Sequence, residues 1–236
     1  MTHFAGKLTW LGHAMFSIES KSGQRLVIDP FIEPNPKFPK GFDLSRVDVI
    51  AATHGHFDHF GGSGLDLARR TGATVCAVFE LALWLGEKGY EKVSGMNKGG
   101  SQTIGDFTIH MTQAVHSSGT SRGDQNPPSD PCGYVVEVDG FRIYHAGDTA
   151  VFSDMALIAE MLSPDVALLP IGDFYTMGPA SAAKACELLR VAAAIPMHYG
   201  TFPALTGTAE AFRAEVEERR LATKIFVLEP GTAWRD

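Results

Sequence analysis

Four side chains that can bind a metal ion lie within one octet of the sequence. Residues 53–60 read Thr-His-Gly-His-Phe-Asp-His-Phe, so His54, His56, Asp58 and His59 each offer a ligand. Imidazole nitrogen and carboxylate oxygen suit zinc, manganese or iron at an enzyme centre, and the octet contains no thiol. Left unpaired beside an apolar strand, such polar groups would each cost roughly 1–3 kcal/mol. A catalytic metal site is therefore the first hypothesis, ahead of a packing role.

The spacing within the octet favours two ions. An apolar run at 47–52 predicts a buried strand before the octet, and Gly61-Gly62 predicts a turn after it. In extended backbone, side chains two residues apart point to the same side, so His54 and His56 can hold one ion together. Asp58 and His59 follow after the chain has begun to turn. They are better placed to hold a second ion.

The composition is that of an ordinary globular enzyme. Of the 236 residues, 44% are hydrophobic and 20% charged, and no linker interrupts the chain, so we expect one domain spanning 1–236. The net charge of -7 argues against a nucleic-acid surface. The start lacks the pattern of a signal peptide, and no apolar run reaches membrane-spanning length. We therefore expect a cytoplasmic protein with no membrane partner.

Cysteine usage points away from thiolate chemistry. Cys76, Cys132 and Cys186 are widely spaced and include no Cys-x-x-Cys pair. The sequence therefore indicates neither a disulfide framework nor a thiolate zinc site.

Strands and helices alternate along the chain. Residues 7–29 show the period of strands around a Ser22-Gly23 hairpin turn, and Asp139-Gly140 is a second hairpin signal. We predict helices at 63–71, 80–89, 154–162, 179–190 and 208–220, and further strands at 74–79, 90–93, 101–104, 106–114, 133–138, 141–145, 165–170, 194–197 and 224–228. Both halves place strands first and helix–strand units after, which indicates an α/β fold.

Three more polar residues follow predicted strands: His116, Asp148 and His198. With the octet they form the pattern His-x-His-x-Asp-His, a distant His, Gly-Asp-Thr and a last distant His. Over almost the whole chain this order resembles the metallo-β-lactamase superfamily. The resemblance implies an αββα four-layer sandwich of two mixed β-sheets flanked by helices. It assigns one metal to His54, His56 and His116, the other to Asp58, His59 and His198, and both to Asp148.

The motifs Trp10-Leu-Gly-His, Gly147-Asp-Thr and Ile195-Pro-Met-His-Tyr resemble a narrower group. This is the branch of small bacterial metal-dependent hydrolases near L-ascorbate-6-phosphate lactonase. The narrower resemblance bears on fold and chemistry more than on substrate.

The ligand set implies a dinuclear metal-dependent hydrolase. Two divalent ions, zinc first and manganese or iron otherwise, can share a bridging hydroxide that attacks a small ester, lactone or phosphoester. Asp58 and Asp148 are the expected catalytic carboxylates. The alternatives are a nuclease or phosphodiesterase of the tRNA-processing type, a mononuclear iron persulfide dioxygenase, and a metal-binding module without catalysis. We expect a small-molecule substrate and no nucleic-acid partner; a homo-oligomer stays open.

The roles of several other polar residues are less specific. Asp29 is either a hydrogen-bond partner behind a ligand imidazole or a turn residue. We interpret His13 as a turn histidine, with a place at the site mouth as the alternative, and His145 as a hydrogen-bonded core residue. The loop from Ser117 to Pro131 is either a lid or a solvated connector. Contact with substrate or support of the ligands is expected of Asp173, Tyr175, Thr176 and Tyr199.

Overall fold

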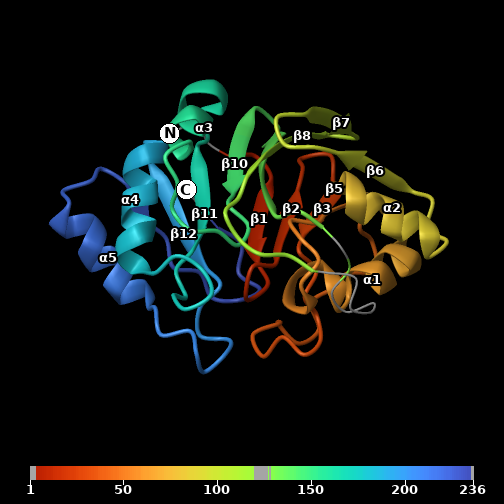
Figure 1. Cartoon of the computed structure of the whole chain (residues 1–236), viewed down its shortest axis with the longest axis horizontal. Coiled ribbons are helices and arrows are strands. Elements are labelled where there is room, and N and C mark those ends of the chain that lie inside the picture. The colour runs from red at the N-terminus through yellow and green to blue at the C-terminus, as the bar shows by residue number, and fades with distance from the viewer. Residues whose placement is uncertain (1–3, 120–126, 128, 235–236) are drawn as a thin grey trace.

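Two mixed β-sheets form the centre of the molecule (Figure 1). The computed structural model describes residues 4–119, 127 and 129–234. The first sheet contains, in spatial order, β1 (Lys7–Trp10), β2 (Phe16–Glu19), β3 (Arg25–Ile28), β4 (Val49–Ala51), β5 (Thr74–Val78) and β6 (Val93–Met96). The second contains β13 (Lys224–Ile225), β12 (Ala193–Met197), β11 (Val166–Pro170), β10 (Phe141–His145), β9 (Cys132–Val138), β8 (Phe107–Gln113) and β7 (Ser101–Ile104). Each sheet has an antiparallel part and a parallel part.

Helices cover the outer faces of the sheets. In Figure 1, α1 (Gly64–Thr71) and α2 (Phe79–Glu87) flank the first sheet, while α3 (Met155–Leu162), α4 (Pro179–Leu189) and α5 (Ala209–Glu218) flank the second. The order helix, sheet, sheet, helix confirms the predicted four-layer sandwich. Within the described ranges, no helix combines the length and the apolar character needed to cross a membrane.

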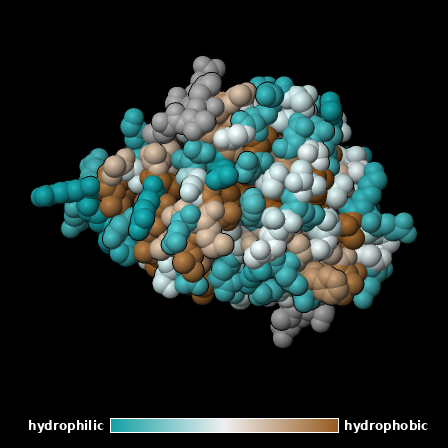
Figure 2. All heavy atoms as spheres, turned by 90° about the horizontal axis from the view of Figure 1, so that it is seen from above, coloured by the Kyte–Doolittle hydropathy of each residue, from teal (hydrophilic) through white to brown (hydrophobic). Residues whose placement is uncertain are grey.

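The apolar runs of the sequence become the central parallel strands. Every residue of β11 and β12 is buried, as expected for strands covered on both faces. One hydrophobic cluster contains side chains from both sheets, and a second joins the C-terminal sheet to α3, α4 and α5. Hydrophilic side chains dominate the face seen in Figure 2, with hydrophobic ones scattered between them. Burial therefore fixes which faces of the sheets pack together.

Local signals set several boundaries. Pro179 occupies the first turn of α4, and the Thr208 hydroxyl caps α5 by accepting a hydrogen bond from Ala211 N at 3.1 Å.

Two strands differ from their predicted bounds. The strand predicted at 90–93 lies instead at Val93–Met96, because the Tyr90 hydroxyl is hydrogen-bonded to the carbonyls of Ala68 and Ala73. The strand predicted at 224–228 is likewise shorter and ends at Ile225.

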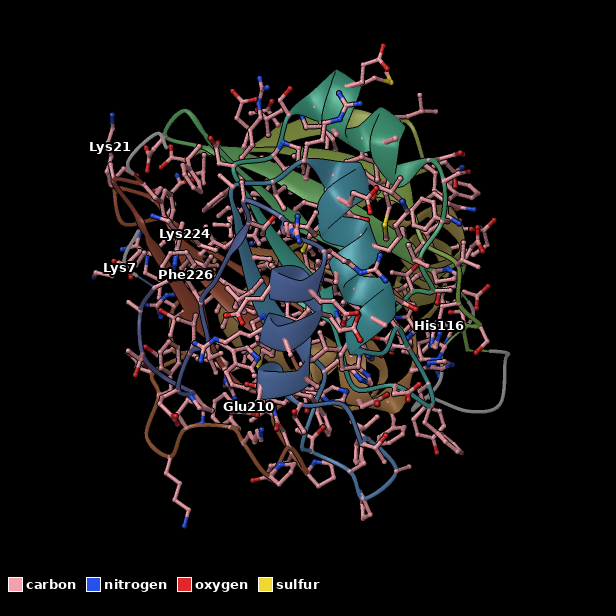
Figure 3. The ribbon with its side chains drawn as sticks, turned by 90° about the vertical axis from the view of Figure 1, so that its left-hand side faces the viewer. Lys7, Lys21, His116, Glu210, Lys224 and Phe226 are labelled. Carbon is pink, nitrogen blue, oxygen red and sulfur yellow. The ribbon has the colours of Figure 1, made fainter. Side chains whose placement is uncertain are left out.

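The strands direct the predicted ligands to one edge of the sandwich. β8, β10, β11 and β12 share one direction, so the residues that follow β8, β10 and β12 emerge together. The loops after β8 and β10 are joined by a hydrogen bond from Val115 N to Thr149 Oγ1 at 2.9 Å. His116 lies at this edge, on the side of the molecule opposite Lys7 and Lys224 (Figure 3). The edge therefore carries the candidate site.

Candidate metal centre

A change of backbone conformation divides the octet. His54 and His56 lie in the extended segment after β4, and His56 has φ −62° and ψ 152°. The next five residues form a single π-helical turn, η1 (Phe57–Gly61), which contains Asp58 and His59. The turn rotates the second pair of side chains away from the first. This is the divergence that the spacing predicts.

Three histidines form the first group of candidate ligands. One ring nitrogen of each of His54, His56 and His116 lies within 4.8 Å of the other two. His54 Nε2 and His56 Nδ1 are 2.9 Å apart. Burial lowers the pKa of all three imidazoles, and His54 is affected most strongly. The rings are therefore held neutral, which is the form that a metal ion requires.

The second group combines a carboxylate with imidazoles. Ligand atoms of Asp58, His59 and His198 lie within 4.8 Å of one another, together with one from His13. Burial alone would raise the pKa of Asp58, but the His13 hydrogen bond and the nearby His59 hold it at about 2. Asp58 is therefore ionised at neutral pH and can bind a cation.

Asp148 lies between the two groups. Its Oδ2 is 3.0 Å from His198 Nε2, 3.2 Å from His59 Nε2 and 3.5 Å from His116 Nε2. Burial opposes ionisation of this carboxyl, yet the adjacent His198 and His59 hold its pKa well below the usual range. The loop geometry depends on Gly147, whose φ of 63° suits glycine and whose Cβ, if present, would meet the Cys132 carbonyl at 2.5 Å.

The unpaired polar atoms of the cluster fit a bound cation. Buried side-chain atoms without a hydrogen-bond partner include His59 Nε2, Asp148 Oδ1 and both ring nitrogens of His198. His59 Nε2 and His198 Nε2 are close to Asp148 Oδ2, but neither approach has the geometry of a hydrogen bond. Native proteins rarely leave buried polar atoms unsatisfied. Metal ions bound among these atoms would satisfy His59 Nε2, Asp148 Oδ1 and one of the two His198 ring nitrogens, which point in different directions.

Asp29 orients two of the candidate ligands from behind. Its carboxylate accepts hydrogen bonds from His59 Nδ1 at 2.7 Å and from the Thr53 hydroxyl at 2.6 Å. Because the hydroxyl gives its proton to Asp29, it accepts from His54 Nδ1 at 3.0 Å. His54 and His59 therefore both present Nε2 to the cluster. The predicted hydrogen bond from a ligand imidazole to Asp29 is confirmed.

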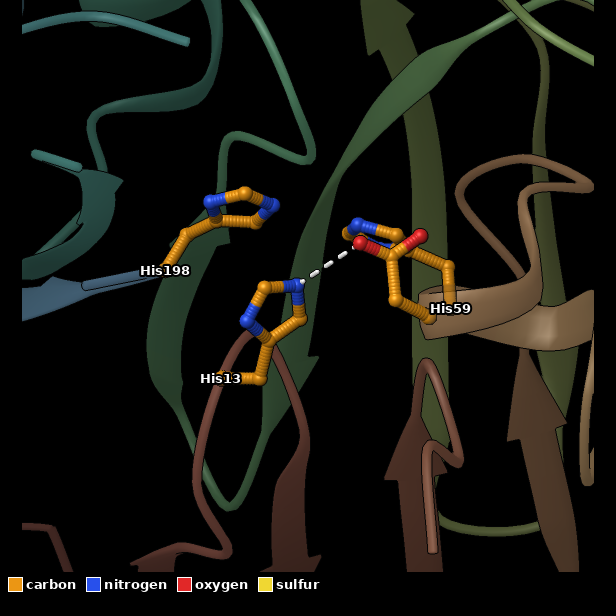
Figure 4. A group of neighbouring side chains, drawn as sticks. His13, His59 and His198 are labelled. Atoms are coloured by element: carbon orange, nitrogen blue, oxygen red, sulfur yellow. Dashed lines mark hydrogen bonds and ion pairs between the residues drawn. The ribbon is translucent and has the colours of Figure 1, made fainter. Parts of the chain in front are cut away.

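For His13 the sequence favours a turn position and keeps a place at the site as the alternative, and the structure shows both a turn and a contact with the site. His13 lies in a turn, but its side chain is buried against Asp58, with Nε2 3.2 Å from Oδ2 and Nδ1 2.7 Å from Thr201 Oγ1. Figure 4 shows the His198 ring beside that of His13, with ring centroids 3.8 Å apart, and a dashed line starts at the His13 ring. Burial lowers the pKa of His13 to about 3, so its ring is neutral. An ionised Asp58 can only accept, so Nε2 carries the proton and Thr201 donates to Nδ1.

Removing the Nε2 donor is expected to weaken metal binding by Asp58. His13→Asn lacks a donor at that position and should lower metal affinity roughly 10- to 100-fold, as changes behind a ligand commonly do. His13→Gln places an amide N–H near the Nε2 position and should recover most of the affinity. Competition with a chromogenic chelator measures both, with His110→Asn on β8 as the matched control. Wild-type affinity in His13→Asn would contradict this role.

The remaining sequence expectations concern His145, Tyr199 and the loop from Ser117 to Pro131. His145 is buried and its Nε2 lies 2.8 Å from the Ala14 carbonyl, which confirms a core position. Tyr199 stacks on Trp10 with ring centroids 5.5 Å apart and so supports the region behind His198. Of the loop predicted as a lid or connector, residues 120–126 and 128 lie outside the described residues. Ser129, near its end, accepts a hydrogen bond from Gly55 N at 2.7 Å.

A cavity of about 720 Å³ opens beside the cluster. Its described lining includes the candidate ligands His56, Asp58, His116, Asp148 and His198. The rest of the described lining is Ser117 and the largely apolar set Phe57, Tyr175, Phe202, Pro203 and Ala204. Of these, Phe202 to Ala204 were not singled out from the sequence, although they closely follow His198 in the chain. The cavity brings a substrate-sized space to the candidate ligands.

Comparisons with known proteins identify the family of the chain. The model of the family described as a beta-lactamase superfamily domain matches residues 7–198. A UPF0173 metal-dependent hydrolase of Solibacter usitatus is 49% identical over 227 residues, covering 95% of this chain and 97% of the relative. One from Methanopyrus kandleri is 44% identical over 229 residues, covering 97% and 99%. Igni18, a novel metallo hydrolase from Ignicoccus hospitalis, has a solved structure with a TM-score of 0.85 and 37% identity, and the match covers 97% of both chains. The chain therefore belongs to the beta-lactamase superfamily, within its UPF0173 metal-dependent hydrolases.

Proposed function

We propose that this metal-dependent hydrolase is dinuclear and acts on a small ester, lactone or phosphoester. The observation that carries the proposal is the position of Asp148, whose Oδ2 lies within 3.5 Å of imidazoles from both ligand groups. A carboxylate in that position can bridge two cations. His54, His56 and His116 would hold one ion, and Asp58, His59 and His198 the other.

The ions would supply an acidified water and would polarise the oxygen of the scissile bond. The side chains of the protein position these partners. Asp58 is ionised, lines the cavity and has one oxygen fixed by His13, so its other oxygen is available to orient the attacking water. Asp29 and Thr53 hold His59 and His54 in the tautomers that expose Nε2. No Ser or Cys nucleophile is needed.

The rival reactions make different demands on the site. A nuclease needs cations to hold a phosphate backbone, whereas the described cavity lining contains neither Lys nor Arg and the net charge is -7. A persulfide dioxygenase uses one iron, whereas the described residues include two groups of ligand atoms that share no residue: His54, His56 and His116 in one, and His13, Asp58, His59 and His198 in the other. We therefore favour a small-molecule substrate. We also keep the expectation of a cytoplasmic enzyme.

Elemental analysis paired with a substrate panel tests the proposal. Protein purified without added metal is expected to contain about two divalent ions per chain, zinc first and manganese or iron otherwise. The same preparation should hydrolyse at least one of a generic ester, a lactone and a phosphodiester. One iron per chain with sulfur-dependent oxygen uptake would replace the proposal with the dioxygenase. RNA cleavage at substoichiometric enzyme would replace it with the nuclease, and bound metal without any turnover would leave a binding module.

A further inference from the structure

Aromatic side chains stand exposed beside the catalytic cavity. Phe57 is 40% exposed, Tyr175 54% and Phe174 72%, and all three belong to segments that form or adjoin the cavity. Phe202 is partly buried and follows His198, the last candidate ligand in the sequence. Its ring centroid lies 6.1 Å from that of Phe57. Exposed apolar groups gathered at a cavity indicate a binding surface.

The turn that carries two of these rings is strained. Asp173 and Phe174 are consecutive non-glycine residues with φ values of 64° and 56°. Each such residue costs about 1–3 kcal/mol and persists only where its surroundings enforce the conformation. Hydrogen bonds from Asp173 N to the Met177 carbonyl and from Phe174 N to Asp173 Oδ1 hold the turn. The Phe174 ring then packs edge-on against Tyr175 with centroids 4.7 Å apart, which fixes the ring that lines the cavity.

We propose that these aromatic residues bind an apolar acyl or aryl group of the substrate, next to the bond that is hydrolysed. Phe57, Tyr175 and Phe202 all line the cavity, and the rings of Phe57 and Phe202 pack against each other. This inference rests on the proposed function, since it names the kind of group that an ester or lactone substrate carries. A charged group in the same place would lose part of its hydration beside rings that carry no charge to pair with it. A cavity of about 720 Å³ has room for such a group beside the metal centre.

Binding of alkyl hydroxamates to the metal-loaded protein tests the inference without requiring turnover. The hydroxamate group binds the metal, and acetyl, butyryl and hexanoyl members differ only in the alkyl chain. Calorimetric titration should show Kd falling about threefold to fourfold per added methylene. The monohydroxamate of adipic acid, which ends in a carboxylate, should bind at least about tenfold more weakly than the hexanoyl compound. Equal Kd values along the series, or tight binding of the adipic compound, would overturn the proposal.

Substitutions of Tyr175 and Phe202 test whether these rings cause the dependence of Kd on chain length. Tyr175→Ala and Phe202→Ala should each reduce the ratio of the acetyl Kd to the hexanoyl Kd, whereas Tyr175→Phe, which keeps the ring, should preserve it. Phe79→Ala on α2 removes an exposed Phe outside the cavity lining and should leave the ratio unchanged. A ratio that survives in both alanine variants refutes the assignment. Failure of the proposed function is distinct, because it would appear as absent metal or absent hydrolysis on the substrate panel.

Discussion

Asp148→Ala is expected to lose both metal ions and hydrolytic activity together. The Asp148 carboxylate lies close to imidazoles of both ligand groups, and its neighbours His59 and His198 have no hydrogen-bond partner for Nε2. Without it, Asp58 would be the only carboxylate of the predicted ligand set, beside five imidazoles. Activity should fall by more than the roughly 10- to 100-fold that accompanies loss of a residue behind a ligand.

His56→Ala provides an informative contrast. Its ring belongs to the three-histidine group alone, so this variant should lose about one ion per chain and keep the ion held by Asp58, His59 and His198. Elemental analysis and turnover on the best substrate of the panel measure both variants. Asp66→Ala on α1 and His110→Ala on β8 are the matched controls, since both side chains lie outside the cluster. Full activity with either Asp148→Ala or His56→Ala would remove the dinuclear assignment.

The sequence singled out His116, Asp148 and His198 because each follows a predicted strand, and the resemblance to the metallo-β-lactamase superfamily joined them to the octet as one ligand set. In the structure, β8, β10 and β12 share one direction, which brings the residues that follow them to one edge. The separation of His54 and His56 from Asp58 and His59 also followed from local backbone, since an extended segment gives way to a turn. What the sequence could not specify is the type of turn. The π-helical form depends on backbone hydrogen bonds such as Gly61 N to the His56 carbonyl.

His13 shows where local pattern fails. Its partners Asp58 and Thr201 lie 45 and 188 residues away along the chain, so no spacing rule connects them. The Gly12-His13 pair predicts a turn, and the turn is present, but its φ of 54° at His13 serves to place the ring between Asp58 and His198. The only sequence signal was the Trp10-Leu-Gly-His motif. Trp10 Nε1 donates to the His13 carbonyl at 2.9 Å, as does His198 N at 3.0 Å.

The same long-range constraint explains the misplaced strand. Residues 90–93 have a pattern that a strand could adopt, but the Tyr90 hydroxyl reaches back to carbonyls on either side of Gly72. Pairing of β6 with β5 therefore begins at Val93, opposite Val75. Periodicity predicts that an element exists more reliably than where it begins, because the ends depend on contacts with distant segments.

Removing the metal is expected to lower the thermal stability of the protein substantially. In the metal-free chain, His59 Nε2, Asp148 Oδ1 and the His198 ring nitrogen that would face the ion are buried without hydrogen bonds. Each such atom costs about 1–3 kcal/mol relative to a satisfied one. A ligand at 100 times its Kd stabilises the folded state by about 2.7 kcal/mol per site, which for a chain of this size raises Tm by roughly 5–10 °C.

Calorimetric scans of chelator-treated protein, with and without restored metal, measure this difference. Two filled sites should raise Tm by more than the single-site value, and His56→Ala, which keeps one group of ligands, should show a smaller rise than the wild type. Asp148→Ala should show almost none, because the residue that serves both groups is gone. Asp66→Ala should behave as the wild type does. A wild-type Tm that is the same with and without metal would mean that these buried atoms do not bind an ion, and the metal centre would have to be sought elsewhere in the chain.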